Sequence, residues 1–138
     1  MSLAFGNLTN EDVWVAYMFW SPNDCGGEGG DWQAIGWFGV PGVRDRPRPH
    51  IPPKGPTAEG SNTVTVYAND LKNVNNRYWY FYAQNTSRSR VWAGPVNVFV
   101  SDEAFNHCIK LGRTGWWIAG FRRLDFGDAN NAVVLLSA

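Results

Sequence analysis

Short runs of β-branched and aromatic residues recur along the chain, and clusters of Gly, Asn and Pro separate them. This pattern is typical of β-strands joined by turns. It predicts strands over residues 3–7 (at a sheet edge), 13–20, 31–38, 63–68, 78–83, 96–100, 116–126 and 132–136. We therefore predict an all-β fold, an antiparallel β-sandwich or small barrel of about seven or eight strands.

Two of these runs indicate how the strands are covered. Residues 13–20 (VWVAYMFW) are apolar at every position, which predicts a central strand that is buried on both faces. Residues 78–83 alternate, so that three tyrosines share one face and Trp79, Phe81 and Ala83 share the other.

Helix signals are weak and confined to one segment. At most one short helix is expected near 102–110, with Ser101 or Asp102 as its cap and Gly112 just past its end. No internal repeat and no second domain is evident, so we interpret residues 1–138 as a single β domain.

A Pro-rich basic segment interrupts the strand pattern. Residues 44–56 read RDRPRPHIPPKGP, with five prolines. Because proline cannot donate to a sheet ladder, we expect an exposed loop over 43–57. Such a stretch can dock in the aromatic groove of a partner, but a solvated loop without a partner is the simpler interpretation.

The aromatic content is high for so short a chain: 138 residues include eight Trp, eight Phe and five Tyr. A ring buries roughly 150–250 Å² when it packs, so these rings can fill most of a core. We expect most of the tryptophans that lie in strand-like runs to be core residues, namely Trp14, Trp20, Trp37, Trp79 and Trp92.

The charge balance restricts the partners. Twelve basic and twelve acidic residues cancel, so no overall field attracts nucleic acid, and we expect no nucleic-acid partner. The longest apolar run has eight residues, too few to span a bilayer, so we expect no transmembrane segment, although peripheral membrane contact stays open. The oligomeric state is not predicted.

Catalytic and metal-binding chemistry has few candidate residues. Cys25 and Cys108 can form one disulfide or stay as two thiols, and both alternatives are open. His107 adjoins Cys108, but neighbouring side chains usually point apart and do not form a catalytic pair. His50 lies in the Pro-rich segment. We therefore predict no enzyme activity, no catalytic residues, no cofactor and no metal site.

Three tryptophans and one arginine are the candidate ligand-binding residues. Trp32 adjoins a Gly-rich segment, and Trp116 and Trp117 follow the turn that carries Arg113. Because adjacent strand residues point to opposite faces, one of Trp116 and Trp117 is expected to be more exposed than the other. An exposed ring beside polar groups can stack on the apolar face of a sugar; the alternative is that all of these rings pack in the core.

An ordered set of motifs along the whole chain resembles a bacterial family of small secreted all-β domains of unknown function, some of which are labelled putative integral membrane proteins. The motifs are Asn7-Leu8-Thr9 followed by Val13–Ala16, Gly36-Trp37 followed by Pro41-Gly42, Arg77-Tyr78 with Tyr80–Ala83, Trp92-Ala93-Gly94-Pro95, Phe105 with Cys108, and Gly120–Asp125. The resemblance implies an all-β secreted-type domain and supplies no activity or catalytic residues. The family pattern has more cysteines, including one near Val98–Val100, and lacks the Pro-rich insert, so no disulfide scheme is carried over.

Three functions are compatible with these observations. We favour a non-catalytic recognition domain that binds a carbohydrate or a protein surface, in a secreted or cell-envelope location. No export signal is recognised at the start of the chain. The alternatives are a membrane-active, toxin-like β protein that uses interfacial Trp and Tyr and, more remotely, a secreted hydrolase.

Overall fold

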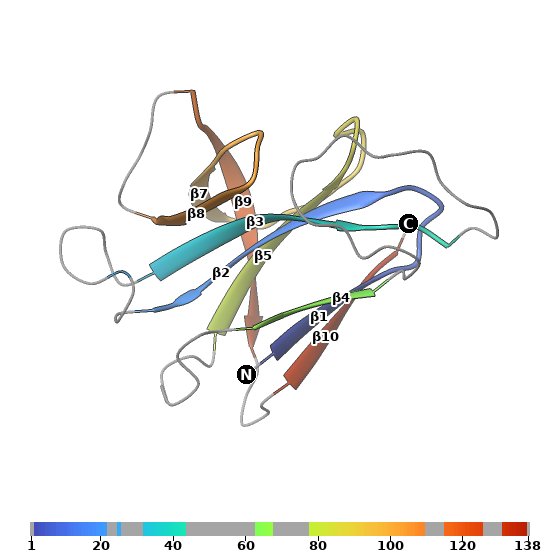
Figure 1. Cartoon of the computed structure of the whole chain (residues 1–138), viewed down its shortest axis with the longest axis horizontal. Coiled ribbons are helices and arrows are strands. Elements are labelled where there is room, and N and C mark those ends of the chain that lie inside the picture. Colours follow the sequence, from blue (N-terminus) through green and yellow to red (C-terminus); the bar gives the residue numbers. More distant parts are fainter. Residues whose placement is uncertain are drawn as a thin grey trace.

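The computed structural model describes residues 2–21, 25, 32–43, 63–67, 78–109, 115–125 and 131–137. In these ranges it contains no helix, so the predicted all-β fold is confirmed (Figure 1). The Pro-rich segment after Val43 lies outside the described residues. The strands are β1 Ser2–Asn7, β2 Val13–Trp20, β3 Trp32–Val40, β4 Thr63–Tyr67, β5 Tyr78–Asn85, β6 Val91–Trp92, β7 Val96–Val100, β8 Phe105–Cys108, β9 Trp117–Asp125 and β10 Asn131–Leu136.

The strands form two sheets. The large sheet has the order β7-β9-β5-β2-β3-β8, with the short strand β6 added to β5. The small sheet has the order β10-β1-β4. Strands β1 and β10 pair in parallel, whereas the other pairs are antiparallel. The two sheets pack in a sandwich, as predicted (Figure 1).

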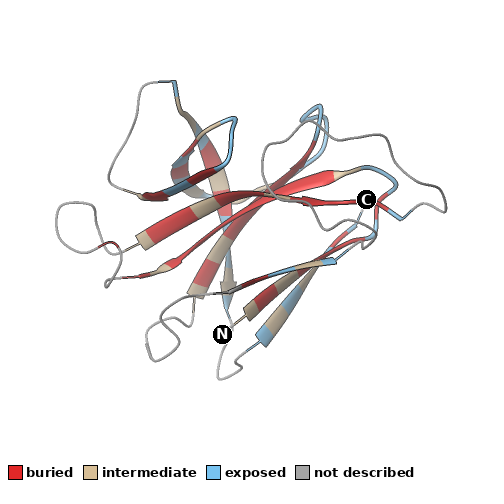
Figure 2. Ribbon diagram, in the orientation of Figure 1, coloured by how far each residue is buried: buried red, intermediate tan, exposed pale blue. Residues whose placement is uncertain are grey.

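Strand β2 lies in the middle of the large sheet and is buried on both faces, as its continuous apolar sequence predicts (Figure 2). On one face, its side chains enter the core between the two sheets, which we call the inter-sheet core. The buried members of the inter-sheet core are Leu3, Phe5, Val13, Val15, Tyr17, Phe19, Val40, Val66, Trp79, Phe81, Ala83 and Leu136.

The opposite face of the large sheet is enclosed by the sheet's own end strands. The sheet curls so that its two end strands, β7 and β8, lie close together at one end of the molecule (Figure 1). Side chains inside this bend form the curl core, whose buried members are Trp14, Ala16, Met18, Ala34, Trp37, Tyr82, Val98, Val100, Phe105, Ala119 and Phe121. Strand β5 serves both cores, with Trp79 and Phe81 on one face and Tyr82 on the other, as its alternation predicts.

A histidine joins the two ends of the curled sheet. His107 is buried in β8, and its Nε2 lies 2.8 Å from the carbonyl oxygen of Phe99 in β7. A carbonyl can only accept a hydrogen bond, so Nε2 carries the proton and donates it. The bond replaces the backbone ladder that would close a full barrel.

Two expectations need correction. The strand at the N-terminus is not an edge strand, because β1 lies between β10 and β4 and pairs with both. The described residues 102–109 contain the strand β8 and no helix, where at most one short helix is expected. Phe105 and His107 are buried and Asn106 between them is exposed, which is the period of a strand, and pairing with β3 outweighs a weak helix propensity.

Candidate functional site

All eight tryptophans lie among the described residues, and none of them is exposed. Trp14, Trp37 and Trp79 are completely buried. The other five, Trp20, Trp32, Trp92, Trp116 and Trp117, are half-buried. The aromatic content of the sequence is therefore used mainly to fill two cores, and the tryptophans that solvent reaches are only half-buried.

Trp32 lies on one rim of the curl core. Its ring meets Tyr80 edge to face, with the ring centroids 5.5 Å apart. Its carbonyl oxygen accepts a hydrogen bond from the Ile109 backbone N–H at 3.0 Å. Nearby, Cys108 forms a disulfide with Cys25, 83 residues earlier, which settles the alternatives that the sequence leaves open. The position of Trp32 is thus fixed by a backbone hydrogen bond and by a nearby disulfide.

Trp116 is packed by two side chains of β8. Its ring lies edge to face with His107 at 4.5 Å between centroids and tilted against Phe105 at 5.5 Å. Both Trp116 and Trp117 are half-buried, so neither of the two rings is fully exposed. Arg113 lies outside the described residues.

Among the candidate residues, Trp117 combines a ring stack, a cation–π contact and a side-chain hydrogen bond. On its core side it stacks on the buried Trp37, with centroids 6.3 Å apart and an interplanar angle of 17°. On its solvent side the guanidinium carbon of Arg88 lies 4.3 Å from the ring centroid. The indole Nε1–H donates to Asp102 Oδ1 at 2.9 Å. Asp102 also forms an ion pair with Arg88, so the three side chains make a closed triangle.

This triangle, which we call the Arg88 triad, consists of Arg88, Asp102 and Trp117. The two charged side chains are largely accessible, at 44% for Arg88 and 71% for Asp102. They come from the β5–β6 hairpin and from the β7–β8 connection, whereas Trp117 begins β9. The sequence gives no signal for Arg88 or Asp102, because partners from three separate segments follow no local spacing.

The backbone of Arg88 has an unusual conformation. Its φ is 62°, in the left-handed region that non-glycine residues seldom adopt and that costs about 1–2 kcal/mol. The hairpin turn sets this conformation: the Arg88 N–H donates to Asn85 O at 3.2 Å, and the Asn85 N–H donates to Arg90 O at 3.0 Å. The turn thereby carries the guanidinium to the ring of Trp117.

Two buried asparagines fasten the loop between β1 and β2. Asn7 Nδ2 donates to the backbone oxygens of Glu11 and Val40, at 2.7 and 2.8 Å. Asn85 Nδ2 donates to Glu11 Oε2 at 3.1 Å and to Ser89 Oγ at 2.8 Å. Both amide groups are therefore used to hold neighbouring loops in place.

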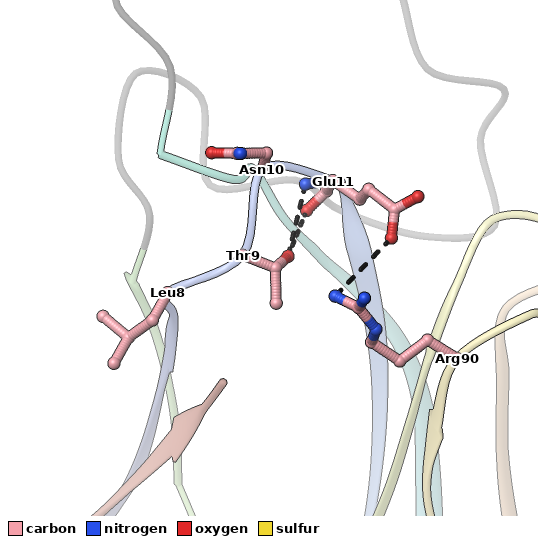
Figure 3. A pocket seen from close by; sticks show the side chains of 5 residues that line it. All are labelled: Leu8, Thr9, Asn10, Glu11 and Arg90. Carbon is pink, nitrogen blue, oxygen red and sulfur yellow. Dashed lines mark hydrogen bonds and ion pairs between the residues drawn. The ribbon is translucent and has the colours of Figure 1, made fainter. Parts of the chain in front are cut away.

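A small pocket lies above this network (Figure 3). It has a volume of about 290 Å³ and is lined by Leu8, Thr9, Asn10, Glu11 and Arg90. Glu11 and Arg90 face one another at 4.0 Å across it, and Thr9 Oγ1 is bonded to the Glu11 backbone. These contacts hold the loop against the hairpin.

Burial affects the acidity of one tyrosine in each core. Burial raises the pKa of Tyr17 in the inter-sheet core to about 12. Burial also raises the pKa of Tyr82 in the curl core, and the charge of Arg88 partly opposes that shift. Both phenols are neutral near neutral pH.

The described ranges provide little for other chemistry. They contain no group of three or more His, Cys, Asp or Glu side chains that could hold a metal ion. They also contain no helix with the length and apolar character needed to cross a membrane.

Comparison of the chain with family models, curated proteins and solved structures finds no significant match. The resemblance to the bacterial family therefore stays a prediction from its motifs.

Proposed function

We propose that this protein is a non-catalytic recognition domain that binds a protein surface through the Arg88 triad. The observation that carries the proposal is the guanidinium of Arg88 held over Trp117 and paired with Asp102, with both charged groups accessible. Arginine and the large aromatic residues are the side chains most enriched among the residues that dominate protein–protein binding energies.

The geometry favours a protein over a sugar as the partner. Sugar stacking needs an accessible ring face, but Trp37 lies on one side of Trp117 and Arg88 on the other. Phe99 and Ile118 pair across β7 and β9 and are 37% and 55% exposed, but they lie on the other face of these strands from Trp117 and do not belong to this site. Both faces of the Trp117 ring are therefore covered, whereas the charged groups of Arg88 and Asp102 stay accessible to a partner.

The charged pair also fits the role energetically. An exposed ion pair contributes only about 0–1 kcal/mol to stability, so Arg88 and Asp102 can exchange partners at little cost. The fork of the guanidinium can bind a partner carboxylate with two hydrogen bonds, and Asp102 can accept from a partner Lys or Arg.

The test is a selection of binders from a displayed protein and peptide library, with a glycan array and neutral vesicles tested in parallel. We expect protein binders whose affinity falls about tenfold or more on Arg88→Ser or on Asp102→Lys. Arg123→Ser is the matched control, because Arg123 lies 4.9 Å from the ring of Tyr78 in a similar contact elsewhere on β9.

Binding to glycans or to neutral vesicles that is lost on Arg88→Ser would contradict the choice of a protein partner. Protein binders that are equally sensitive to Arg88→Ser and Arg123→Ser would contradict the choice of the Arg88 triad. Thermal unfolding of each variant controls for loss of fold.

A further inference from the structure

We propose that two copies of this chain associate by antiparallel pairing of β10 with β10, which joins their small sheets into one continuous sheet. This interface lies on a different sheet from the Arg88 triad, and the inference does not depend on the proposed function.

The outer edge of β10 has backbone groups directed away from the sheet. The Leu8 N–H donates to Leu136 O at 2.9 Å, so the carbonyl of Leu136 points toward β1. Because successive residues of a strand direct their backbone groups to opposite sides, the N–H and C=O groups of Val133 and Leu135 point to the outer edge. Among the described residues, no strand pairs with that edge.

The same two residues present apolar side chains to solvent. Val133 is 64% exposed and Leu135 is 61% exposed, the highest values among the large apolar side chains of the described ranges. Their outer face continues onto β1, where the Cδ2 atom of Leu135 lies 3.0 Å from the position that a Cβ on Gly6 would occupy. Val133 and Leu135 therefore provide both the unpaired backbone groups of β10 and an exposed apolar surface.

In the described part of the chain, this edge lacks the usual protection against pairing. Natural edge strands carry Lys or Pro, a bulge or a covering segment. Residues 131–136 read NAVVLL, with no charge, no proline and no glycine. By contrast, β7 and β8, the ends of the large sheet, are joined by the hydrogen bond between His107 and Phe99 O.

A second copy is the occupant that fits this strand. Antiparallel pairing of a strand with itself brings equivalent residues close to a two-fold axis, so any charge there would face a like charge. The absence of charge from 131–136 makes the strand complementary to itself.

The pairing register follows from the side chains. With Val133 opposite Leu135 of the second copy, both outward-directed residues pair and the outer side chains at the centre of the interface are all apolar, while Asn131 faces Ser137 at its two ends. A shift that pairs Val133 with itself would set Leu135 against Asn131. A shift that pairs Leu135 with itself would set Val133 against Ser137, whose carbonyl oxygen already accepts a hydrogen bond from Trp92 Nε1 at 3.3 Å. An interface of one strand pair is small, so we expect a weak dimer that depends on concentration.

The test is sedimentation velocity over a concentration series. We expect the wild type to pass from monomer to dimer, and Val133→Lys or Leu135→Glu to weaken dimerisation about tenfold or more. A mixture of the two variants should regain the dimer, because the proposed register sets the introduced lysine opposite the introduced glutamate. Ile118→Lys, at a similarly exposed position on β9, is the control and should leave the dimer intact.

Amide hydrogen exchange on the wild type tests the same interface without substitution. The amides of Val133 and Leu135 should become protected as the concentration rises. A wild type that stays monomeric, a dimer that survives both β10 substitutions, or exchange at these amides that is independent of concentration would overturn the proposal. Arg88→Ser should leave dimerisation unchanged, so failure here and failure of the proposed function are separate results.

Discussion

The two faces of the large sheet bury aromatic side chains in different ways. The inter-sheet core is closed by backbone, because the small sheet lies over Phe19, Trp79 and Phe81. The curl core is closed by side chains, because Trp32, Trp116 and Trp117 form its half-buried rim. The half-buried rings of the inter-sheet core are Phe38 and Trp92, whereas the rim of the curl core presents three tryptophans to solvent.

This difference indicates where a binding function can be added to such a fold. A ring beneath a second sheet cannot contact a partner without unfolding the sandwich. A ring at the rim needs only a cover of surface side chains, and Arg88 and Asp102 provide that cover for Trp117. The following experiments test whether the two cores differ in this way.

The largest expected effect comes from removing a ring from each core. Trp79→Ala should cost about 3–5 kcal/mol of unfolding free energy, because Trp79 is completely buried and packs on Tyr17 and Phe19. Trp117→Ala should cost about 2 kcal/mol, because its ring is only half-buried. Urea unfolding measures both values, and equal costs would show that the rim is as structural as the inter-sheet core.

Loss of the disulfide should affect the curl core selectively. Replacing Cys25 and Cys108 by Ser is expected to cost about 2–4 kcal/mol, since the bond closes a segment of 83 residues. Hydrogen exchange should accelerate at Ile109, whose N–H is bonded to Trp32 O, and stay slow in β1. Faster exchange of both regions to the same extent would mean that the two cores unfold as one unit.

Alkaline pH should lower the free energy of unfolding mainly through the ionisation of Tyr17 in the inter-sheet core. The pKa of Tyr17 is about 12 in the folded protein against about 10 when the chain is unfolded, so the unfolded chain loses its proton first. Stability is then fully present below pH 10 and falls by about 2–3 kcal/mol as the pH rises to 12. Tyr17→Phe should flatten the fall in urea titrations over this range, and an unchanged slope would contradict the assignment.

The smallest effect is expected where the curled sheet is joined. His107→Leu keeps an apolar volume in β8 but removes the hydrogen bond to Phe99 O, which should cost about 1–2 kcal/mol. Exchange should accelerate in β7 while β1 and β10 are unaffected. A variant with unchanged stability and exchange would show that the strands stay together without this bond.

The strands that can be predicted from the sequence are those whose burial follows from the local pattern of apolar residues. The two-sided burial of β2 can be predicted from its continuous apolar run, and the two faces of β5 from the alternation of its rings. The central place of β1 cannot be predicted, because it depends on pairing with β10 from the opposite end of the chain. The Arg88 triad is hidden for the same reason, since Arg88 and Asp102 meet Trp117 only after the sheet curls.

The two fully engaged asparagines, Asn7 and Asn85, have a practical consequence for producing the protein. Each begins an Asn-x-Ser/Thr tripeptide, the acceptor for N-linked glycans in eukaryotic secretion, and the glycan is attached through the side-chain nitrogen. In the folded protein that nitrogen already donates two hydrogen bonds in each case. A sugar added to the emerging chain would occupy the space of this network, so a host without that modification is the appropriate source of correctly folded protein.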